Sequence, residues 1–430
     1  MAKQNYSNFV QLLKTRGFID LKHVTRNDRS YFLADYGPPG TLLRRNVLNQ
    51  WWKTMVLQQG SVFPVESPVF QPSTNMESSV SSLPPAAGEI NYRESLQQDC
   101  VSKYLQVLKL TNGRLPISIA TTGSCLSWRE TQVDEPEEKV LLFGCSNLSR
   151  LLFQIYLPPT GVSVIFDNWL QLRLSWWKKF SRHPTNFSVT SSESTNSTSN
   201  STGDSLTNSN GSKSNNQSPH TMYIMYEFPW GPEPVEEVTN MGDKLLTQLQ
   251  EDGDQSYKGK DAENKSCLPH CIECSSNIEA ATAAWLIDSF SERRPYSAAR
   301  KQERLSSVLQ LHPHIAPYQV AIVMSLPPAS SVSLASSLKM HQTCDQLETD
   351  FQETGISVFN ISLQGHVLEA QFKRNDQLGI PYTVIVTDVT ITDGAIQIRE
   401  RDSQFQSESN ISSIVDSLSE NLRAKLEVTE

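Results

Sequence analysis

The stretch YGPPGTLLRRNVLNQWWKTMVLQQGSVFPVESP, residues 36–68, decides the fold of this chain of 430 residues. After the Gly-Pro-Pro-Gly turn at 37–40, residues 42–58 contain no Gly or Pro and predict a helix about 25 Å long. Gly60 is placed to end it, and residues 62–65 predict a short strand limited by prolines. The apolar side chains of the helix recur at steps of three and four, which is typical of one broad buried face: Leu43, Val47, Leu48, Trp51, Trp52, Met55 and Val56.

The composition indicates a globular intracellular protein with two or three domains. Hydrophobic residues make up 38% of the chain, and the net charge of -9 argues against a protein coated in positive charge while allowing a local basic surface. No window approaches the length of apolar sequence that a membrane span needs, so we expect no membrane contact. The 7 cysteines lack regular spacing over most of the chain, which favours reduced thiols.

The first residues allow two interpretations. Residues 1–19 carry Lys3, Lys14 and Arg16 without an acid, which is compatible with a mitochondrial presequence. The apolar run from Phe9 to Leu13 favours instead the buried face of a first folded helix.

The middle of the chain predicts an antiparallel sheet with helices. A helix is expected over 92–110, strands over 117–126, 140–143 and 151–157, and a further helix from Asp167. Residues 188–218 consist mostly of Ser, Thr and Asn, which cannot bury enough apolar surface to offset their ordering entropy. We therefore predict a disordered insertion at 184–220.

Two groups of polar side chains suggest ligands. Cys267, His270, Cys271 and Cys274 are residue types that bind zinc, but their spacing favours a strand with buried free thiols, so we expect no metal and no cofactor. In the helix that follows Asp167, Arg173, Lys178, Lys179 and Arg182 lie among tryptophans. Such a stripe is suited to nucleic acid, although taken alone it more often marks a core helix with a solvated basic edge.

The C-terminal region alternates strands and helices, which indicates a small three-layer α/β domain. It contains neither a GxGxxG motif nor a P-loop, so a nucleotide pocket of those kinds is not supported. Strands are expected at 320–324, 356–359, 382–386 and 395–399, and helices at 333–351, 367–378 and 410–426.

Together these segments resemble a class II aminoacyl-tRNA synthetase of the glycyl type. Residues 36–68 look like the first motif of that class, a dimer-interface helix and strand, and FPWG at 228–231, GIPYTVIV from Gly379 and IRERD from Ile398 are similar as well. The catalytic motifs differ. Where the second motif of the family has a phosphate-binding Arg, this chain has Ser127, with Arg129 two residues further on. Where the third motif has a Gly-rich turn and an Arg, residues 276–282 contain neither and place Glu279 there.

A synthetase-like chain with these losses resembles the accessory, processivity subunits of the mitochondrial DNA polymerase gamma. The segments NVLNQWWKTMV, RLSWWKKF, MYEFPWG and HPHIAPYQVAI carry that resemblance. It implies an α+β fold, with a class II synthetase-like antiparallel sheet domain followed by an anticodon-binding-like α/β domain with a mixed sheet. The expected division is 1–183 and 221–310 for the synthetase-like core and 311–430 for the second domain.

The resemblance further implies a protein that is not an enzyme, located in the nucleoids of the mitochondrial matrix. Its partners would be the catalytic polymerase subunit and duplex or primer-template DNA, with a homodimer as a further possibility. Alternatives left open are an active glycyl-type synthetase and a catalytically dead tRNA-binding scaffold. The expected DNA contacts are Arg44, Arg45, Lys53, Arg173, Lys178, Lys179 and Arg182. The expected polymerase contacts are Asp393, Gly394, Arg399, Arg401 and Asp402, and the expected dimer contacts are Leu43, Val47, Trp51 and Met55.

Overall fold

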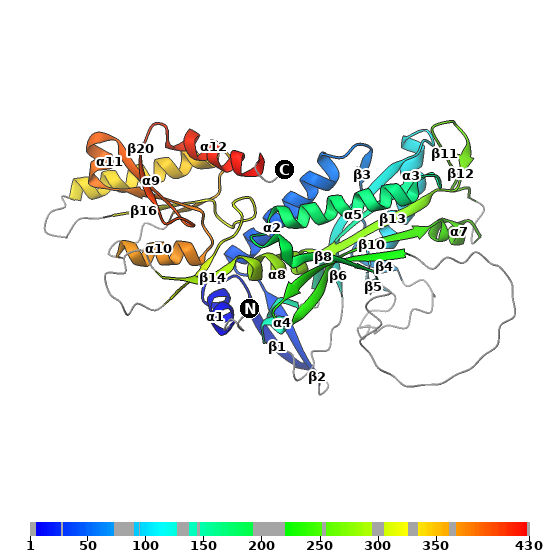
Figure 1. Ribbon diagram of the computed structural model, residues 1–430, viewed down its shortest axis with the longest axis horizontal. Coiled ribbons are helices and arrows are strands. Elements are labelled where there is room, and N and C mark those ends of the chain that lie inside the picture. Colours follow the sequence, from blue (N-terminus) through cyan, green and yellow to red (C-terminus); the bar gives the residue numbers. More distant parts are fainter. Residues whose placement is uncertain are drawn as a thin grey trace.

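Two main sheets organise the protein, one of seven strands and one of five (Figure 1). Four two-stranded sheets accompany them: β1 (Asp20–Arg26) with β2 (Arg29–Asp35), β4 (Phe70–Pro72) with β5 (Ile90–Tyr92), β11 (Gly259–Lys260) with β12 (Ser266–Cys267), and β14 (Phe290–Arg293) with β15 (Ser306–Leu309). The computed structural model describes residues 6–26, 29–72, 90–93, 95–126, 137–143, 147–191, 220–251, 255–294, 305–325, 334–360 and 367–427.

The seven-stranded sheet has the order β3-β6-β7-β13-β10-β9-β8. β3 runs parallel to β6, and every other neighbouring pair is antiparallel. The strands are β3 (Val62–Pro64), β6 (Ile117–Leu126), β7 (Asn147–Leu157), β8 (Phe187–Ser191), β9 (His220–Phe228), β10 (Gly231–Gly242) and β13 (His270–Asn277). This sheet is the antiparallel sheet that the sequence predicts for the first domain.

The opening stretch forms α2 (Pro38–Trp52), a π-helical turn (Lys53–Leu57) and β3. The helix begins earlier than the predicted Leu42, because Pro38 and Pro39 lie in its first turn, where a missing N–H costs no hydrogen bond. Gly40 permits a close approach to the chain before it. A Cβ atom there would collide with the carbonyl oxygen of Phe18.

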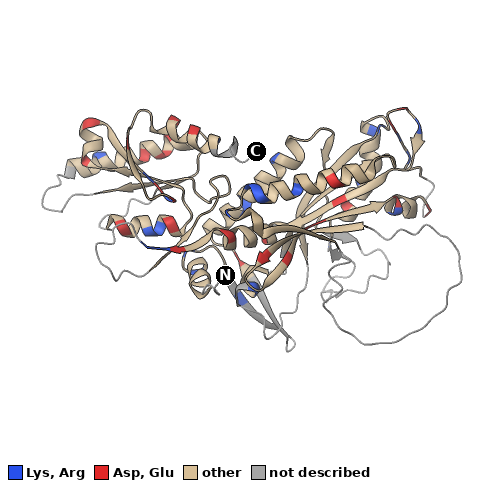
Figure 2. Cartoon of the chain, viewed as in Figure 1, with Lys and Arg blue, Asp and Glu red and all other residues tan. Residues whose placement is uncertain are grey.

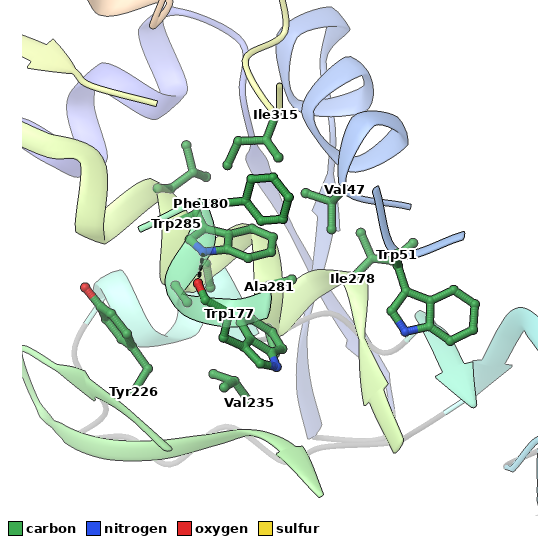
Figure 3. Close-up of a cluster of buried hydrophobic side chains, with 14 of the residues drawn as sticks. Val47, Trp51, Trp177, Phe180, Tyr226, Val235, Ile278, Ala281, Trp285 and Ile315 are labelled. Carbon is green, nitrogen blue, oxygen red and sulfur yellow. Dashed lines mark hydrogen bonds between the residues drawn. The ribbon is translucent and has the colours of Figure 1, made fainter. Parts of the chain in front are cut away.

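Three helices cover one face of the seven-stranded sheet: α2, α5 (Val162–Lys179) and α8 (Ile278–Ser289) (Figure 1). All residues of α8 are buried, so this helix lies inside the domain. Its Trp285 packs on Trp177 of α5 with ring centroids 5.2 Å apart, and the Trp285 indole N–H donates to the Trp177 carbonyl (Figure 3).

The predicted dimer contacts lie in this core, so that prediction is wrong. Leu43, Val47 and Met55 have 0% of their surface exposed and Trp51 has 2%. Val47 and Trp51 point toward α8, where Ile278 lies (Figure 3). A broad apolar helix face predicts burial, but it does not say whether the covering surface belongs to the same chain or to a second copy.

The opposite face of the sheet packs against α3 (Gln97–Leu110) and α7 (Lys244–Glu251). Tyr104 of α3 packs against Tyr156 of β7, with ring centroids 4.6 Å apart. Two of the cysteines that the sequence predicts as free thiols lie on opposite faces of β13. Cys271 packs in the cluster under α3, and Cys274 packs in the cluster under α8. Both are buried and free, as expected for a strand with structural thiols, and their separation breaks the ligand set of the zinc alternative.

Three local predictions need correction or confirmation. Residues 140–143 belong to a helix, α4 (Glu137–Phe143), and are not a strand. The expected disordered insertion begins with ordered chain, since Pro184–Asn186 form a 3-10 turn and β8 follows, while residues 192–219 lie outside the described part. Phe9, Leu12 and Leu13 are buried in α1 (Ser7–Thr15), which confirms the folded first helix.

The five-stranded sheet has the order β17-β16-β18-β19-β20. β16 (Val320–Met324) is parallel to β17 (Val358–Asn360) and to β18 (Tyr382–Val386), and β19 (Ala395–Glu400) and β20 (Gln406–Asn410) continue antiparallel. The helices are α9 (Leu334–Glu353), α10 (Leu368–Gln377), α11 (Asp388–Asp393) and α12 (Ile414–Glu427). The mixed sheet and its flanking helices agree with the α/β fold predicted for the C-terminal region, whereas the sequence pattern does not predict α11 and β20.

The two sheet domains are joined by a shared cluster of buried residues, and the second domain also has a core of its own, which includes Ile322 and Phe351. Ala321, Leu378 and Ile380 of the second domain belong to the same buried cluster as Phe180 and Trp285 of the first. Residues 312–316 lead from one domain to the other and are held by α2, because the Asn46 side chain donates to the Ala316 carbonyl at 2.7 Å. Among the described helices, none is long and apolar enough to cross a membrane.

Candidate functional site

The N-terminus of α8 lies where the third synthetase motif is expected. A carboxylate of the helix itself, from Glu279 in its first turn, lies at this end. Asn277 caps the helix by accepting from the Ala280 N–H at 2.7 Å. The side chain of Glu279, 1% exposed, forms an ion pair with Arg44 of α2 and accepts from the Ser149 N–H of β7 at 3.0 Å. Burial raises the pKa of Glu279, while the Arg44 charge and these hydrogen bonds act in the opposite direction.

This arrangement removes an anion site. A helix N-terminus with a nearby arginine is suited to bind a phosphate group. Here Glu279 supplies the negative charge, and the Arg44 guanidinium also binds the Ser149 hydroxyl at 2.8 Å and covers the Tyr36 ring at 4.1 Å. Arg44 is therefore tied to structural partners, so its predicted role as a DNA contact is not supported by its surroundings.

The strand of the second motif, β6, is covered by another arginine. Arg93 donates to the Ser124 carbonyl at 2.9 Å and pairs with Asp99 at 2.9 Å, and both charged side chains are almost fully buried. A Cβ atom on Gly123 of β6 would collide with the Arg93 guanidinium, so this glycine permits the contact. Ser127 and Arg129, on which the sequence comparison of this motif rests, lie outside the described residues.

The centre of the same sheet face is a closed network of polar side chains. Glu273 of β13 accepts from Gln97 of α3 at 2.9 Å and from Gln154 of β7 at 2.7 Å. The Tyr156 hydroxyl donates to the amide oxygen of Gln154 at 2.6 Å. Burial raises the pKa of Glu273, and its two amide partners oppose this. These groups satisfy one another within the chain, which is a structural role.

The predicted DNA contact Arg173 is wrong. The side chain is 0% exposed and lies between α5 and the sheet. Its guanidinium donates to both oxygens of Glu236 of β10, and its third nitrogen contacts the Met55 sulfur at 3.1 Å. Since the donors are used inside the core, Arg173 cannot reach a phosphate in this fold.

Other predicted basic residues gather at the C-terminal end of α5, which faces the second domain (Figure 2). Lys53 and Lys179 both lie close enough to His314 to act on its charge: burial lowers the pKa of His314, and these two positive charges lower it further. Lys178 is half-buried, and Arg45 and Arg182 are exposed. Arg45 belongs to α2 and not to the end of α5.

The turn after α5 is held rigidly by Asp288, a buried residue of α8 that sequence reasoning missed. Its carboxylate accepts from the Ser181 hydroxyl at 3.0 Å and from the backbone N–H groups of Arg182 and His183. The same carboxylate accepts from the Tyr226 hydroxyl at 3.3 Å. Asp288 therefore fixes the turn that carries Arg182. No local sequence pattern distinguishes Asp288 from other acidic residues.

The linker between the domains adds a histidine to the basic surface, which comprises Lys53, Lys178, Lys179 and Arg182. His314 Nε2 lies 3.0 Å from the Leu422 carbonyl of α12, so it donates a hydrogen bond there, and the backbone N–H of His314 donates to His312 Nδ1 at 3.3 Å. His312 in turn packs edge-on against Phe180 at the end of α5, with centroids 5.3 Å apart. The basic surface consequently spans the junction of the two domains.

The predicted polymerase contacts divide into buried and accessible residues. Arg399 is 5% exposed and binds both oxygens of Asp376, and Arg401 is 2% exposed. These two arginines hold the hairpin of β19 and β20 in place and do not face solvent. Asp393 is exposed, Gly394 ends α11 with a φ of +74°, and the Asp402 side chain is 39% exposed.

Sequence comparison with known proteins identifies one family model and several related chains. A family model described as an anticodon binding domain matches residues 320–421, which contain most of the five-stranded sheet domain. DNA polymerase subunit gamma-2 of Mus musculus is 28% identical over 90% of this chain and 83% of its own length, and that of Xenopus laevis is 26% identical over 95% and 85%. A glycine–tRNA ligase of Borreliella afzelii is 21% identical over 93% of both chains.

The relationship therefore extends across both sheet domains. The chain has the α+β fold of a class II synthetase with an anticodon-binding domain, and it is a relative of the DNA polymerase gamma-2 subunits and, at lower identity, of the glycine–tRNA ligases.

Proposed function

We propose that this protein is a non-catalytic accessory subunit of the mitochondrial DNA polymerase gamma, which binds the catalytic subunit and DNA and raises processivity in the nucleoids of the matrix. The similarity to two gamma-2 subunits over most of their length supports this assignment. The observation that best supports a protein without catalytic activity is the Glu279–Arg44 ion pair at the N-terminus of α8.

This ion pair opposes phosphate binding electrostatically. Aminoacylation requires positive groups aimed at the phosphates of ATP. At α8 those positive groups, the helix N-terminus and Arg44, are neutralised by a buried carboxylate. A triphosphate brought to the same place would meet Glu279 and would have to displace Arg44 from it. The fold supports a binding function better than phosphate chemistry.

The proposed DNA surface comprises Lys53, Lys178, Lys179 and Arg182, with Arg45 on α2 as a further member. Lys53 and Lys179 both lie close enough to His314, at the junction of the two domains, to lower its pKa. A second DNA-contacting surface slows dissociation of a polymerase complex. If the association rate is unchanged, about 1.4 kcal/mol of additional binding lengthens the residence time about tenfold.

The test is a primer-extension assay with the purified catalytic subunit under single-encounter conditions. A trap of unlabelled DNA is added with the nucleotides, so that product length reports one binding event. We expect longer products when this protein is present than with the catalytic subunit alone. Unchanged product lengths at saturating protein would contradict the proposed function.

The match of residues 320–421 to an anticodon binding domain favours one alternative, a tRNA-binding scaffold without catalysis. Competition binding separates the two: labelled primer-template DNA is bound, and unlabelled tRNA or DNA is added. On the polymerase proposal DNA competes at lower concentration than tRNA. Amino-acid-dependent exchange between ATP and pyrophosphate tests the remaining alternative of an active synthetase, for which we expect no signal.

A further inference from the structure

The turn between β19 and β20 presents an exposed aromatic side chain. Phe405 has 69% of its surface exposed and is the only aromatic residue among the large exposed hydrophobic side chains in the described part of the chain. β20 is the last strand of its sheet, and Phe405 directly precedes it. An aromatic ring left in water at a sheet edge costs solvation free energy, and aromatic residues are enriched where protein surfaces bind one another.

The turn that carries Phe405 is anchored on the protein from below. Arg401 binds both carboxylate oxygens of Asp402 at 2.9 Å and donates to the Gly379 carbonyl at 2.7 Å. Gln310 donates to the same carboxylate at 2.9 Å, and Arg293 donates to the Asp402 carbonyl at 3.2 Å. Burial disfavours the charge of Asp402, but the hydrogen bonds and charge of Arg401 hold its pKa well below the usual range.

The tip itself is also fixed. The Phe405 N–H donates to the Ser403 hydroxyl at 3.2 Å, and the Phe405 carbonyl accepts from the Glu400 N–H at 3.0 Å. Gln404 has a φ of +59°, a left-handed conformation that non-glycine residues adopt only when the surrounding structure holds them there. The ring is thus displayed by a preorganised turn, so binding it costs little conformational entropy.

The accessible charged side chains of the β19–β20 hairpin are acidic, and Arg182 at the end of α5 is a positive charge outside the hairpin that acts on Asp402. The Asp402 side chain is partly exposed, Glu400 is partly exposed, and Glu408 of β20 is exposed. The arginines of the turn are buried beneath it and are paired with Asp376 and Asp402. Accessible carboxylates on the hairpin repel the phosphates of nucleic acid and complement a basic protein surface.

From these observations we propose that Phe405 is a docking anchor that inserts into an apolar, basic-rimmed pocket of the catalytic polymerase subunit. The identity of the partner rests on the proposed function. This proposal places the polymerase contact at the accessible tip of the β19–β20 hairpin. It does not involve Arg399 and Arg401, which are buried.

The experiment measures the affinity of the full-length protein for the purified catalytic subunit by titration calorimetry. We expect Phe405→Ala to weaken binding at least tenfold and Phe405→Leu to weaken it less, because a leucine retains apolar area. Glu408→Lys is expected to weaken binding and to reduce its salt dependence. The matched control is Leu338→Ala, at a side chain of α9 that is 60% exposed and outside the hairpin. Circular dichroism and thermal unfolding verify that each variant folds.

The outcomes separate the two proposals. If the unsubstituted protein does not bind the catalytic subunit, the proposed function and this partner are both overturned. If it binds and Phe405→Ala binds equally well, only the anchor is overturned. A Phe405→Ala variant that loses affinity for DNA instead of for the catalytic subunit would make the hairpin a nucleic-acid contact and would also overturn the anchor.

Discussion

Arg173 and Glu236 form a bidentate ion pair in the core of the first domain, with nitrogen–oxygen distances of 2.7 and 2.9 Å. The Trp177 indole N–H also donates to Glu236, and the Arg173 guanidinium lies 4.5 Å from the centroid of the Trp176 ring. The pair joins α5 to β10. It therefore supports the helix from which Lys178 and Lys179 project.

Removing one partner of this pair should destabilise the protein strongly. Arg173→Ala leaves Glu236 buried without its counter-charge, and breaking such a pair costs about 3 to 5 kcal/mol. Urea unfolding at pH 7 measures the decrease in unfolding free energy. The control is Lys178→Ala on the same helix, for which a change within about 0.5 kcal/mol is expected. Equal stability of the two variants would show that the pair does not hold α5.

The Glu279–Arg44 pair gives a prediction with a pH signature. In Arg44→Ala the opposing charge is removed, and the pKa of Glu279, which burial already raises, should rise further. A carboxyl group with a raised pKa in the folded state binds its proton more tightly than in the unfolded chain. Stability is therefore greatest at low pH and falls as the pH rises through the folded pKa.

We accordingly expect Arg44→Ala to be more destabilised at pH 8 than at pH 5, by urea unfolding at both values. The double variant Arg44→Ala/Glu279→Gln should not show this difference, because the glutamine cannot ionise. A single variant whose deficit is the same at both pH values would mean that Glu279 carries no unpaired charge.

The proposed DNA surface predicts a change in salt dependence. Lys178→Ala/Lys179→Ala/Arg182→Ala should weaken binding to duplex DNA and lower the slope of log K against log salt by about 0.9 for each phosphate that the variant no longer neutralises. Fluorescence anisotropy over a series of salt concentrations measures both quantities. A control with equal charge change uses three exposed lysines away from the end of α5, Lys109, Lys258 and Lys260. If both triple variants behave alike, only overall charge matters and the surface is not specific.

His314 should make the protein sensitive to mild acid. Burial, together with Lys53 and Lys179, lowers its pKa below the ordinary value in the folded state. The unfolded chain then binds a proton that the folded chain excludes, so stability is full above the unfolded pKa and falls as the pH drops toward the folded one. His312, on the same linker, and the Leu422 carbonyl are its other polar neighbours.

His314→Gln is expected to remove part of the stability decrease between pH 7 and pH 5, since glutamine retains a donor for the Leu422 carbonyl and does not titrate. Nuclear magnetic resonance of the histidine ring protons checks the cause directly. In Lys53→Ala/Lys179→Ala the pKa of His314 should rise toward its ordinary value. An unchanged pKa would place both lysines too far away to act on it.

The sequence predicts some elements closely for a physical reason. β16 and β18 occur at the predicted residues, because strands covered on both faces are continuous apolar runs, VAIVM and YTVIV. β20 escapes prediction because an edge strand of sequence QSESN is mostly exposed and has no apolar alternation. The helix α4 resembles a strand in sequence because its apolar run, VLLF, is too short to show a period.

The candidate site is less predictable because it depends on pairs that are distant in sequence. Arg173 and Glu236 are separated by 63 positions and Arg44 and Glu279 by 235, so no local pattern reveals that these charges neutralise each other. The sequence locates basic side chains on α5 without showing which one turns inward. It does place Glu279 at the third-motif position, and the structure adds the partner that explains how a carboxylate is tolerated there.

The buried cluster that Ala321, Leu378 and Ile380 share with Phe180 and Trp285 couples the stability of the two sheet domains. A cut between them would expose apolar surface on both fragments at once, so each half should be less stable alone than in the intact protein. Heating the intact protein should melt both sheets in a single transition. A partner that binds only the second domain would then protect the first from unfolding, because stabilising one half stabilises the whole.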